Sequence, residues 1–141
     1  MAKQKIHLSM ISQGSVLDTV DVDSITAPTV EGEITILPGH IPLFSRLQPG
    51  ELHYKDNNLD ESFAVSAGFI DIGPDCNVTV IVDSVTAARE INVQKAQTAI
   101  DAAHQTMSQS QNRQELQMAE ASLRMALIEL KIAQKTKRAN N

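Results

Sequence analysis

The chain has 141 residues, 42% of them hydrophobic, and a formal net charge of -5. This length suits one domain with a core of its own, or a small domain with an appendage, and it excludes a large enzyme. No apolar run approaches the roughly 20 residues that a membrane-spanning helix needs, and the N-terminus lacks the pattern of a secretory signal. The single cysteine, Cys76, has no partner for an internal disulfide or a CxxC motif. We therefore expect an intracellular protein.

Charge is distributed unevenly along the chain. Residues 1–90 carry 5 Lys and Arg against 13 Asp and Glu, a net of -8, whereas residues 91–141 carry 7 against 4, a net of +3. The acidic part argues against a nucleic-acid surface there, because phosphate contacts need clustered basic side chains. The basic part suits an acidic protein, a nucleotide or nucleic acid.

Short apolar or alternating runs occupy the chain up to about residue 84. Turn signals such as Gln13-Gly14, Asp56-Asn57-Asn58 and Gly73-Pro74-Asp75 separate them. Because no helical pattern intervenes, the sequence predicts an antiparallel β-sandwich or flattened barrel of nine or ten strands. The runs are residues 6–11, 17–22, 25–27, 34–37, 43–47, 52–54, 63–67, 69–72 and 78–82.

The segment Gly32-Glu-Ile-Thr-Ile-Leu-Pro-Gly-His-Ile-Pro-Leu43 predicts a strand that ends in a sharp turn. Pro38 presets φ and Gly39 accepts positive φ, so the strand must turn at this dipeptide. Pro42 and Pro49-Gly50 mark two further corners. Three corners so close together predict a rigid edge of the β layer, which suits recognition better than catalysis.

From about residue 92 the sequence predicts two helices. Apolar residues recur at helical spacing from Val93 to Met107, and Asn92 is placed as the N-cap of the first helix. Residues 108–112 break the pattern, and Leu116, Leu123 and Leu130 then follow seven apart. We expect a hairpin of roughly 15-residue and 20-residue helices, and hence a β-sandwich domain at 1–87 and an α-helical hairpin at 88–141.

The predicted hairpin is rich in alanine. Alanine buries far less apolar area than leucine, so the contact between the hairpin and the sandwich should be weak. An element held by little burial can leave one partner for another, which makes a conformational switch possible.

The segment at 32–42, the later Ser66-Ala-Gly-Phe-Ile-Asp-Ile72 and the β-then-two-helix order resemble the epsilon subunit of the bacterial F-type rotary ATP synthase. The resemblance implies a non-catalytic subunit of the central stalk whose sandwich contacts the gamma subunit and the proton-driven ring of c subunits. It implies a hairpin that inhibits ATP hydrolysis when it extends along gamma into the alpha/beta catalytic head. It also implies a peripheral protein at the cytoplasmic face of the inner membrane, with membrane contact only through the c-ring and no nucleic acid.

The resemblance implies a contact with the c-ring and gamma on the predicted rigid edge. Its carboxylates and imidazole can exchange hydrogen bonds with polar loops of the ring. The alternative is that the two glutamates are solvated loop charges and that the histidine only stabilises a turn. The residues are Glu31, Gly32, Glu33, Gly39, His40 and Pro42.

A basic stripe follows the second predicted helix at intervals of seven, four and three residues. The resemblance implies that basic residues of this helix face an acidic loop of the beta subunits in the inhibited state. The alternative is an ordinary solvated helix face. The stripe consists of Arg124, Lys131, Lys135 and Arg138, of which Lys131 and Lys135 are the preferred candidates.

Some members of the family bind ATP on the folded hairpin through an Ile-Asp-x-x-Arg-Ala motif. The matching positions here are Ile91, Asn92, Lys95 and Ala96. Asn loses the charge of Asp, and Lys loses the planar fork of Arg. The arginines that those members use on the second helix correspond here to Met125 and Glu129, with Arg124 adjacent. We therefore expect weak or absent ATP binding and no cofactor.

Two other functions compete with this interpretation. One is a free-standing β-sandwich adaptor whose basic hairpin binds an acidic protein. The other is a small thiol hydrolase that uses Cys76 and His40, although no base for the cysteine is identifiable and an inert side chain is expected. The four histidines are dispersed and predict no metal site.

Overall fold

The computed structural model describes residues 4–13 and 15–139, with the side chains of Ser15, Leu17, Arg138 and Ala139 excepted. Ten strands are followed by a short 3-10 turn, η1, and two helices. The strands are β1 (Ile6–Ser12), β2 (Ser15–Val22), β3 (Ser24–Thr29), β4 (Gly32–Ile36), β5 (Leu43–Leu47), β6 (Gly50–Asp56), β7 (Leu59–Val65), β8 (Gly68–Ile72), β9 (Asn77–Val82) and β10 (Val85–Ala87). The remaining elements are η1 (Ala88–Glu90), α1 (Val93–Gln109) and α2 (Arg113–Ala139).

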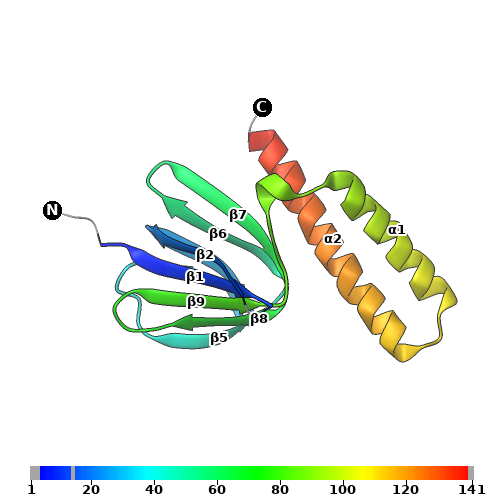
Figure 1. Ribbon diagram of the computed structural model, residues 1–141, viewed down its shortest axis with the longest axis horizontal. Helices are drawn as coiled ribbons and strands as arrows, with labels where there is room; N and C mark the ends of the chain where they lie inside the picture. The colour runs from blue at the N-terminus through cyan, green and yellow to red at the C-terminus, as the bar shows by residue number, and fades with distance from the viewer. Residues whose placement is uncertain (1–3, 14, 140–141) are drawn as a thin grey trace.

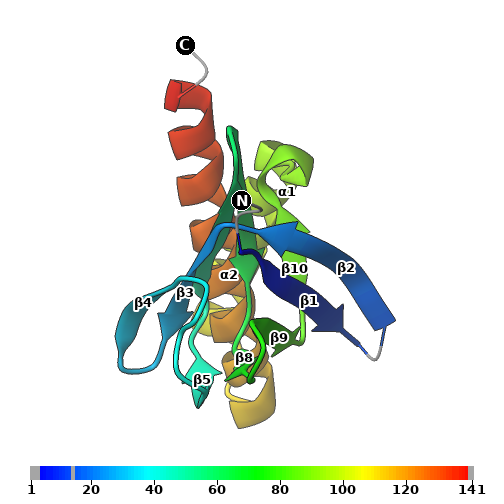
Figure 2. The ribbon, with the colours of Figure 1, turned by 90° about the vertical axis from the view of Figure 1, so that its left-hand side faces the viewer.

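The strands form one continuous sheet that curls on itself into a sandwich beside the two helices (Figures 1 and 2). Its order is β10-β7-β6-β3-β5-β8-β9-β1-β2, and β4 pairs with β3. The pairs are antiparallel except for β1 and β9, which run parallel. The predicted sandwich with a helical hairpin is confirmed. The parallel pair and the three-residue β10 were not expected.

Alternating burial along the strands creates the core of the sandwich. In β1, Ile6, Leu8 and Met10 face inward, and in β9 the inward residues include Val78 and Val80. Each such side chain stabilises the fold by roughly 1.5–3 kcal/mol relative to an exposed position. The sandwich cluster consists of Ile6, Leu8, Met10, Val22, Ile25, Ala27, Ile36, Leu47, Leu52, Tyr54, Phe63, Val65, Ile70, Ile72, Val78, Val80, Val82 and Ala87.

An ion-pair cluster ties the start of β1 to two turns. The Lys5 ammonium lies 2.8 Å from Asp23 Oδ1 and 2.5 Å from Asp56 Oδ1. Hydrogen bonds to Asp23 first and to Asp56 second raise the pKa of Lys5 above its ordinary value. The Asn57 amide donates to Asp23 Oδ2 at 2.7 Å, so this cluster joins the β2–β3 and β6–β7 turns.

Asparagine caps both helices. Asn92 Oδ1 accepts from the Lys95 amide at 3.0 Å, which confirms the predicted N-cap of α1. Asn112 Oδ1 accepts from the amides of Gln114 and Glu115 at 2.9 and 3.1 Å. With 27 residues, α2 is longer than predicted. Across the described residues, neither helix combines the length and apolarity needed to cross a membrane.

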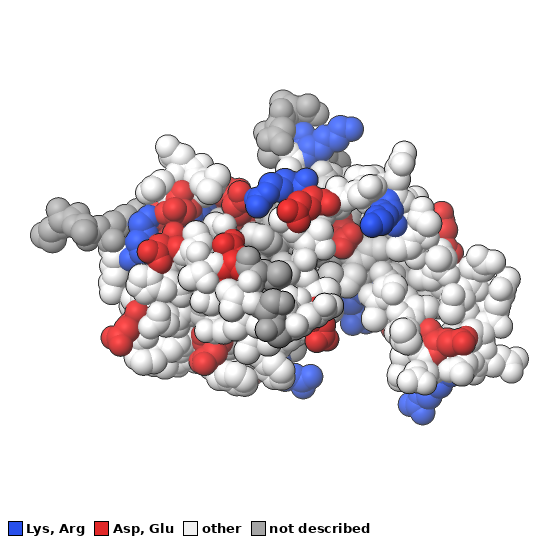
Figure 3. Space-filling view, viewed as in Figure 1, with Lys and Arg blue, Asp and Glu red and all other residues white. Residues whose placement is uncertain are grey.

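The hairpin has a hydrophobic cluster of its own. It shares no residue with the cluster of the sandwich, and most of its fully buried members are alanine. The hairpin packs against the sandwich through α2, which contacts β7, β6 and η1. A notch separates the two parts on one side of this contact (Figure 3). The cluster consists of Ala96, Ile100 and Ala126, with Ala99, Leu123 and Leu130 packed against it.

Candidate functional site

The loop between β4 and β5 contains the sharp turn that the sequence predicts. The His40 amide donates to the Leu37 carbonyl at 3.0 Å, and Gly39 has φ of +87°. Pro38 and Gly39 therefore occupy the central positions of a type II turn, the second of which requires positive φ. His40 Nδ1 donates to the Ile41 carbonyl at 2.7 Å. Since a carbonyl can only accept, Nδ1 carries a proton and Nε2 is left for a partner.

The turn between β3 and β4 is stabilised by a threonine that sequence reasoning missed. Thr29 is only 2% exposed, and its hydroxyl donates to the Gly32 carbonyl and accepts from the Glu31 amide. Gly32 has φ of +123°, a conformation that favours glycine. The side chains of Glu31 and Glu33 are exposed beside this fixed backbone. A threonine directly before a two-residue turn is the signal that could have revealed the bond.

The structure separates the six residues of the predicted edge into two groups. Glu31, Gly32 and Glu33 lie at the start of β4, whereas Gly39, His40 and Pro42 follow its end. A five-residue strand spans about 15 Å, so the groups cannot form one compact site. The edge is therefore an acidic turn and a separate proline-rich loop.

Sequence reasoning also missed an apolar patch on the outer face of β5, β8 and β9, formed by Phe44, Phe69 and Ile81. These side chains are 64%, 42% and 46% exposed. Phe44 opposes Asp71, so Phe69 is its diagonal neighbour across the β5–β8 pair, and the two rings stack with centroids 5.5 Å apart. Ile81 opposes Phe69 on β9. We call these three residues the outer-face patch.

The backbone beneath this patch requires glycine at one position. A Cβ atom on Gly68 would lie 2.0 Å from the Ile81 carbonyl oxygen and 2.9 Å from the Val82 Cα. Both are backbone atoms of β9, which cannot move aside without breaking the pairing. Gly68 thus allows the close approach of β8 and β9 and holds the patch on a rigid support.

The predicted basic stripe divides into residues with different surroundings. Arg124 lies 3.8 Å from Glu120 on α2, and Lys135 lies 3.1 Å from Glu51 on β6. Lys131 is exposed, and none of the ion pairs among the described residues involves it. The side chain of Arg138 lies outside the described part of the chain. Lys131 and Lys135 face a cleft of about 380 Å³ that is also lined by Glu33, Glu51, Pro28, Pro49, Gly50, Ile128 and Ile132.

The positions of the degenerate ATP motif lie at the start of the hairpin. Ile91 is half-buried, Asn92 caps α1 and Ala96 is buried in the hairpin cluster. Lys95 lines a pocket of about 320 Å³ between the helices together with Met125 and Glu129. Glu129 accepts from the Thr86 hydroxyl at 3.4 Å. The pocket thus offers one ammonium group and one carboxylate, a poor combination for a polyphosphate.

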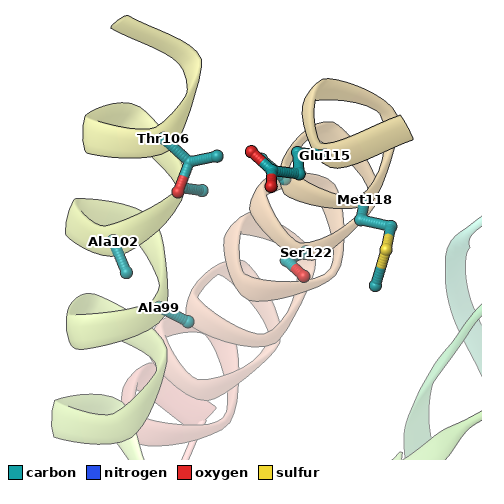
Figure 4. A pocket seen from close by; sticks show the side chains of 8 residues that line it. Ala99, Ala102, Thr106, Glu115, Met118 and Ser122 are labelled. Atoms are coloured by element: carbon teal, nitrogen blue, oxygen red, sulfur yellow. The ribbon is translucent and has the colours of Figure 1, made fainter. Parts of the chain in front are cut away.

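Further along the hairpin the helices diverge around a gap of about 600 Å³. The gap stays open because small side chains line it, namely Ala99 and Ala102 from α1 and Ser122 from α2. Thr106 and Glu115 point toward one another across it (Figure 4). Among the described residues no group of three or more His, Cys, Asp or Glu could hold a metal ion.

Cys76 and His40 have separate partners. Cys76 Sγ accepts from Gln4 Nε2 at 3.2 Å, and His40 is bonded to Ile41. No hydrogen bond links the thiol to an imidazole in the described part of the chain. The geometry therefore lends no support to a thiol hydrolase.

Comparison with known proteins identifies the class to which this sandwich belongs. Residues 5–88 match the family model described as "ATP synthase, Delta/Epsilon chain, beta-sandwich domain". The ATP synthase epsilon chain of Herpetosiphon aurantiacus is 39% identical over 128 residues, which cover 91% of this chain and 93% of that relative. The epsilon chain of Dehalococcoides mccartyi is 37% identical over 135 residues, 95% of this chain and 96% of that relative. The chain therefore belongs to the ATP synthase epsilon chain family, as the resemblance predicted.

Solved structures extend the likeness to the whole fold. A chain of the Euglena gracilis mitochondrial ATP synthase OSCP/F1/c-ring structure superposes with a TM-score of 0.75 at 24% identity, covering 89% of this chain and 79% of that chain. A chain of the mitochondrial ATP synthase central stalk/c-ring structure from Tetrahymena thermophila superposes with a TM-score of 0.62 at 16% identity. The match covers 94% of this chain and 99% of that chain. At these identities the comparison establishes the fold alone.

The pocket beside Lys95 predicts that isolated protein will not bind ATP tightly. Glu129 should repel phosphate, and Lys95 cannot bind it with two parallel hydrogen bonds as arginine does. Isothermal titration with ATP should show no saturation below millimolar concentration. The Lys95→Gln variant serves as a control for any weak signal from this pocket, and saturation well below millimolar by the unmodified chain would contradict the prediction.

Proposed function

We propose that this protein is a non-catalytic rotor subunit of the ATP synthase central stalk. Its sandwich would bind the gamma subunit and the proton-driven c-ring, and its hairpin would restrain ATP hydrolysis by the alpha/beta catalytic head. The observation that carries the proposal is an exposed aromatic patch on a rigid sheet in a member of the epsilon chain family. The protein would lie at the cytoplasmic face of the inner membrane and meet the membrane only through the ring.

The outer-face patch is the proposed contact with gamma. Stacked aromatic side chains on a well-supported sheet resemble the centre of a protein interface. The loop before β5 adds exposed apolar side chains, because Leu37 is 58% and Ile41 74% exposed. This loop also contains His40, whose Nε2 can bond a polar group of the same partner. One apolar surface would thus extend from the loop onto the sheet.

The acidic turn between β3 and β4 is the proposed contact with the c-ring. Thr29 fixes its backbone, so Glu31 is presented without the entropy cost of ordering a flexible loop. A carboxylate in this position can bond cationic or amide side chains of short polar loops. Glu33, by contrast, also lines the cleft beside α2 and has a second possible role there.

The free-standing adaptor remains the second candidate. The basic residues on α2 are compatible with this candidate, because they could bind an acidic partner that is not an ATP synthase subunit. Recovery of gamma and the catalytic head with a tagged chain would support the rotor subunit, whereas recovery of the chain without them would support the adaptor.

The outer-face patch should be required for binding gamma. Replacing Phe44 and Phe69 by serine should weaken binding at least about tenfold, because buried aromatic residues carry much of the energy of an interface. The measurement is a titration of gamma with the purified variant. Leu59→Ser is a matched control, since Leu59 is 54% exposed in the β6–β7 hairpin, outside the patch. Equal affinities for the double variant and the control would refute the assignment.

The acidic turn should be required for coupling. Glu31→Lys reverses its charge without altering the Thr29 bonds to backbone atoms, so the sandwich should remain folded while the contact with the ring weakens. Proton-driven ATP synthesis in vesicles that contain the assembled enzyme should fall severalfold. Asp101→Lys on α1 applies the same charge change away from the turn, and a loss of synthesis as large in this control would argue against a specific contact.

The basic stripe should be required for inhibition. Arg124→Gln combined with Lys131→Gln removes two charges that would face an acidic loop of beta, each worth about 0.2–1 kcal/mol at an exposed position. ATP hydrolysis by the assembled enzyme should rise about two- to tenfold. The pair Lys95→Gln and Arg113→Gln removes the same charge from the hairpin outside the stripe. If hydrolysis rises equally in both variants, the loss of positive charge in general explains the effect, and the specific role of the stripe is contradicted.

A further inference from the structure

The contact that holds α2 on the sandwich is small and partly polar. Ile132 is 2% exposed at the cleft lined by Pro28 and Pro49, but it belongs to neither hydrophobic cluster. Polar contacts between the described residues include the Thr86–Glu129 hydrogen bond at 3.4 Å and the Lys135–Glu51 ion pair at 3.1 Å. Because neither hydrophobic cluster of the described residues spans the junction, one ion pair can change the docking equilibrium appreciably.

The two partners of the Lys135–Glu51 ion pair differ in how exposed their side chains are. Glu51 lies on β6, which is paired with β7 on one side and β3 on the other, and its side chain is 24% exposed, whereas the Lys135 side chain is 72% exposed near the end of α2. The carboxylate is therefore fixed by the sheet, and the lysine reaches it only while α2 is docked. Glu33 lines the same cleft and makes it more negative beside Lys131 and Lys135.

We propose that Glu51 holds the hairpin against the sandwich by binding Lys135, in competition with any acidic partner of that lysine. This inference rests on the proposed function, in which the partner is an acidic surface of the catalytic head. Glu51 would then set the fraction of hairpins that are free to extend, although it lies on the sandwich. Lys135 would thus stabilise the docked state by binding Glu51 and the inhibited state by binding the acidic partner.

The isolated chain tests the ion pair directly. Relaxation dispersion of the Ile132 methyl resonance measures the population in which α2 has left the cleft. Glu51→Gln should raise this population about two- to fivefold, as expected for loss of an exposed ion pair. Added salt should raise it in the unmodified chain and much less in the variant. Asp75→Asn removes the same charge from the β8–β9 turn and should leave the population unchanged.

A double-mutant cycle separates the pair from a general charge effect. Lys135→Gln should resemble Glu51→Gln, and the double variant should open no further than either single variant, because both remove one interaction. Additive effects, or a Glu51→Gln population equal to that of Asp75→Asn, would overturn the proposal.

The assembled enzyme then distinguishes this inference from the proposed function. Glu51→Gln should deepen the inhibition of ATP hydrolysis about two- to fivefold, because more hairpins can extend while Lys135 is retained. If the variant opens the isolated hairpin but hydrolysis stays at the unmodified level, the ion pair stands and the regulatory function is wrong. If the Ile132 resonance shows no added opening, the role of Glu51 is wrong whatever the rate of hydrolysis.

Discussion

The division of buried apolar side chains into two separate clusters is the constraint on which the behaviour of this protein depends. The sandwich cluster contains large aliphatic residues such as Leu8 and Ile70, whereas the fully buried members of the hairpin cluster are two alanines and Ile100. Burial of alanine contributes little, so the hairpin is held by a few larger side chains and by its caps. The sandwich can therefore keep its structure whether or not the hairpin rests on it, and small free-energy differences can decide the position of the hairpin.

Rigid backbone at its edges allows the sandwich to serve as a binding surface. Pro38 restrains the turn before β5, where Gly39 permits the positive φ, Thr29 fixes the acidic turn and Gly68 permits the close approach of β8 and β9. A partner that binds such a surface does not have to order loops, and this lowers the entropy cost of association. A subunit that transmits torque needs the same property, because a flexible contact would yield under load.

Local features of the fold were predictable from the sequence, and features that depend on pairing were not. Pro38-Gly39 and Asn92 act through bonds to neighbouring residues, so their turn and cap followed directly from residue type. The β1–β9 pair joins residues about 70 positions apart, and the outer-face patch joins Phe44 to Phe69 across two strands. Periodicity along one strand carries no information about such neighbours. For the same reason the sequence does not reveal that β4 separates the two halves of the predicted edge.

A lysine with two alternative carboxylate partners allows a switch to be adjusted finely. A contact shifts an equilibrium only by the difference between its contributions to the two states, so an attraction present in both states largely cancels. Lys135 is mostly exposed while it is paired with Glu51, which keeps its contribution to the docked state small. The direction of the shift then depends on which carboxylate is better shielded from water. Because Glu51 is only partly buried, a partner with a more enclosed acidic surface would take the lysine, and the sandwich would release the helix without losing any of its own core.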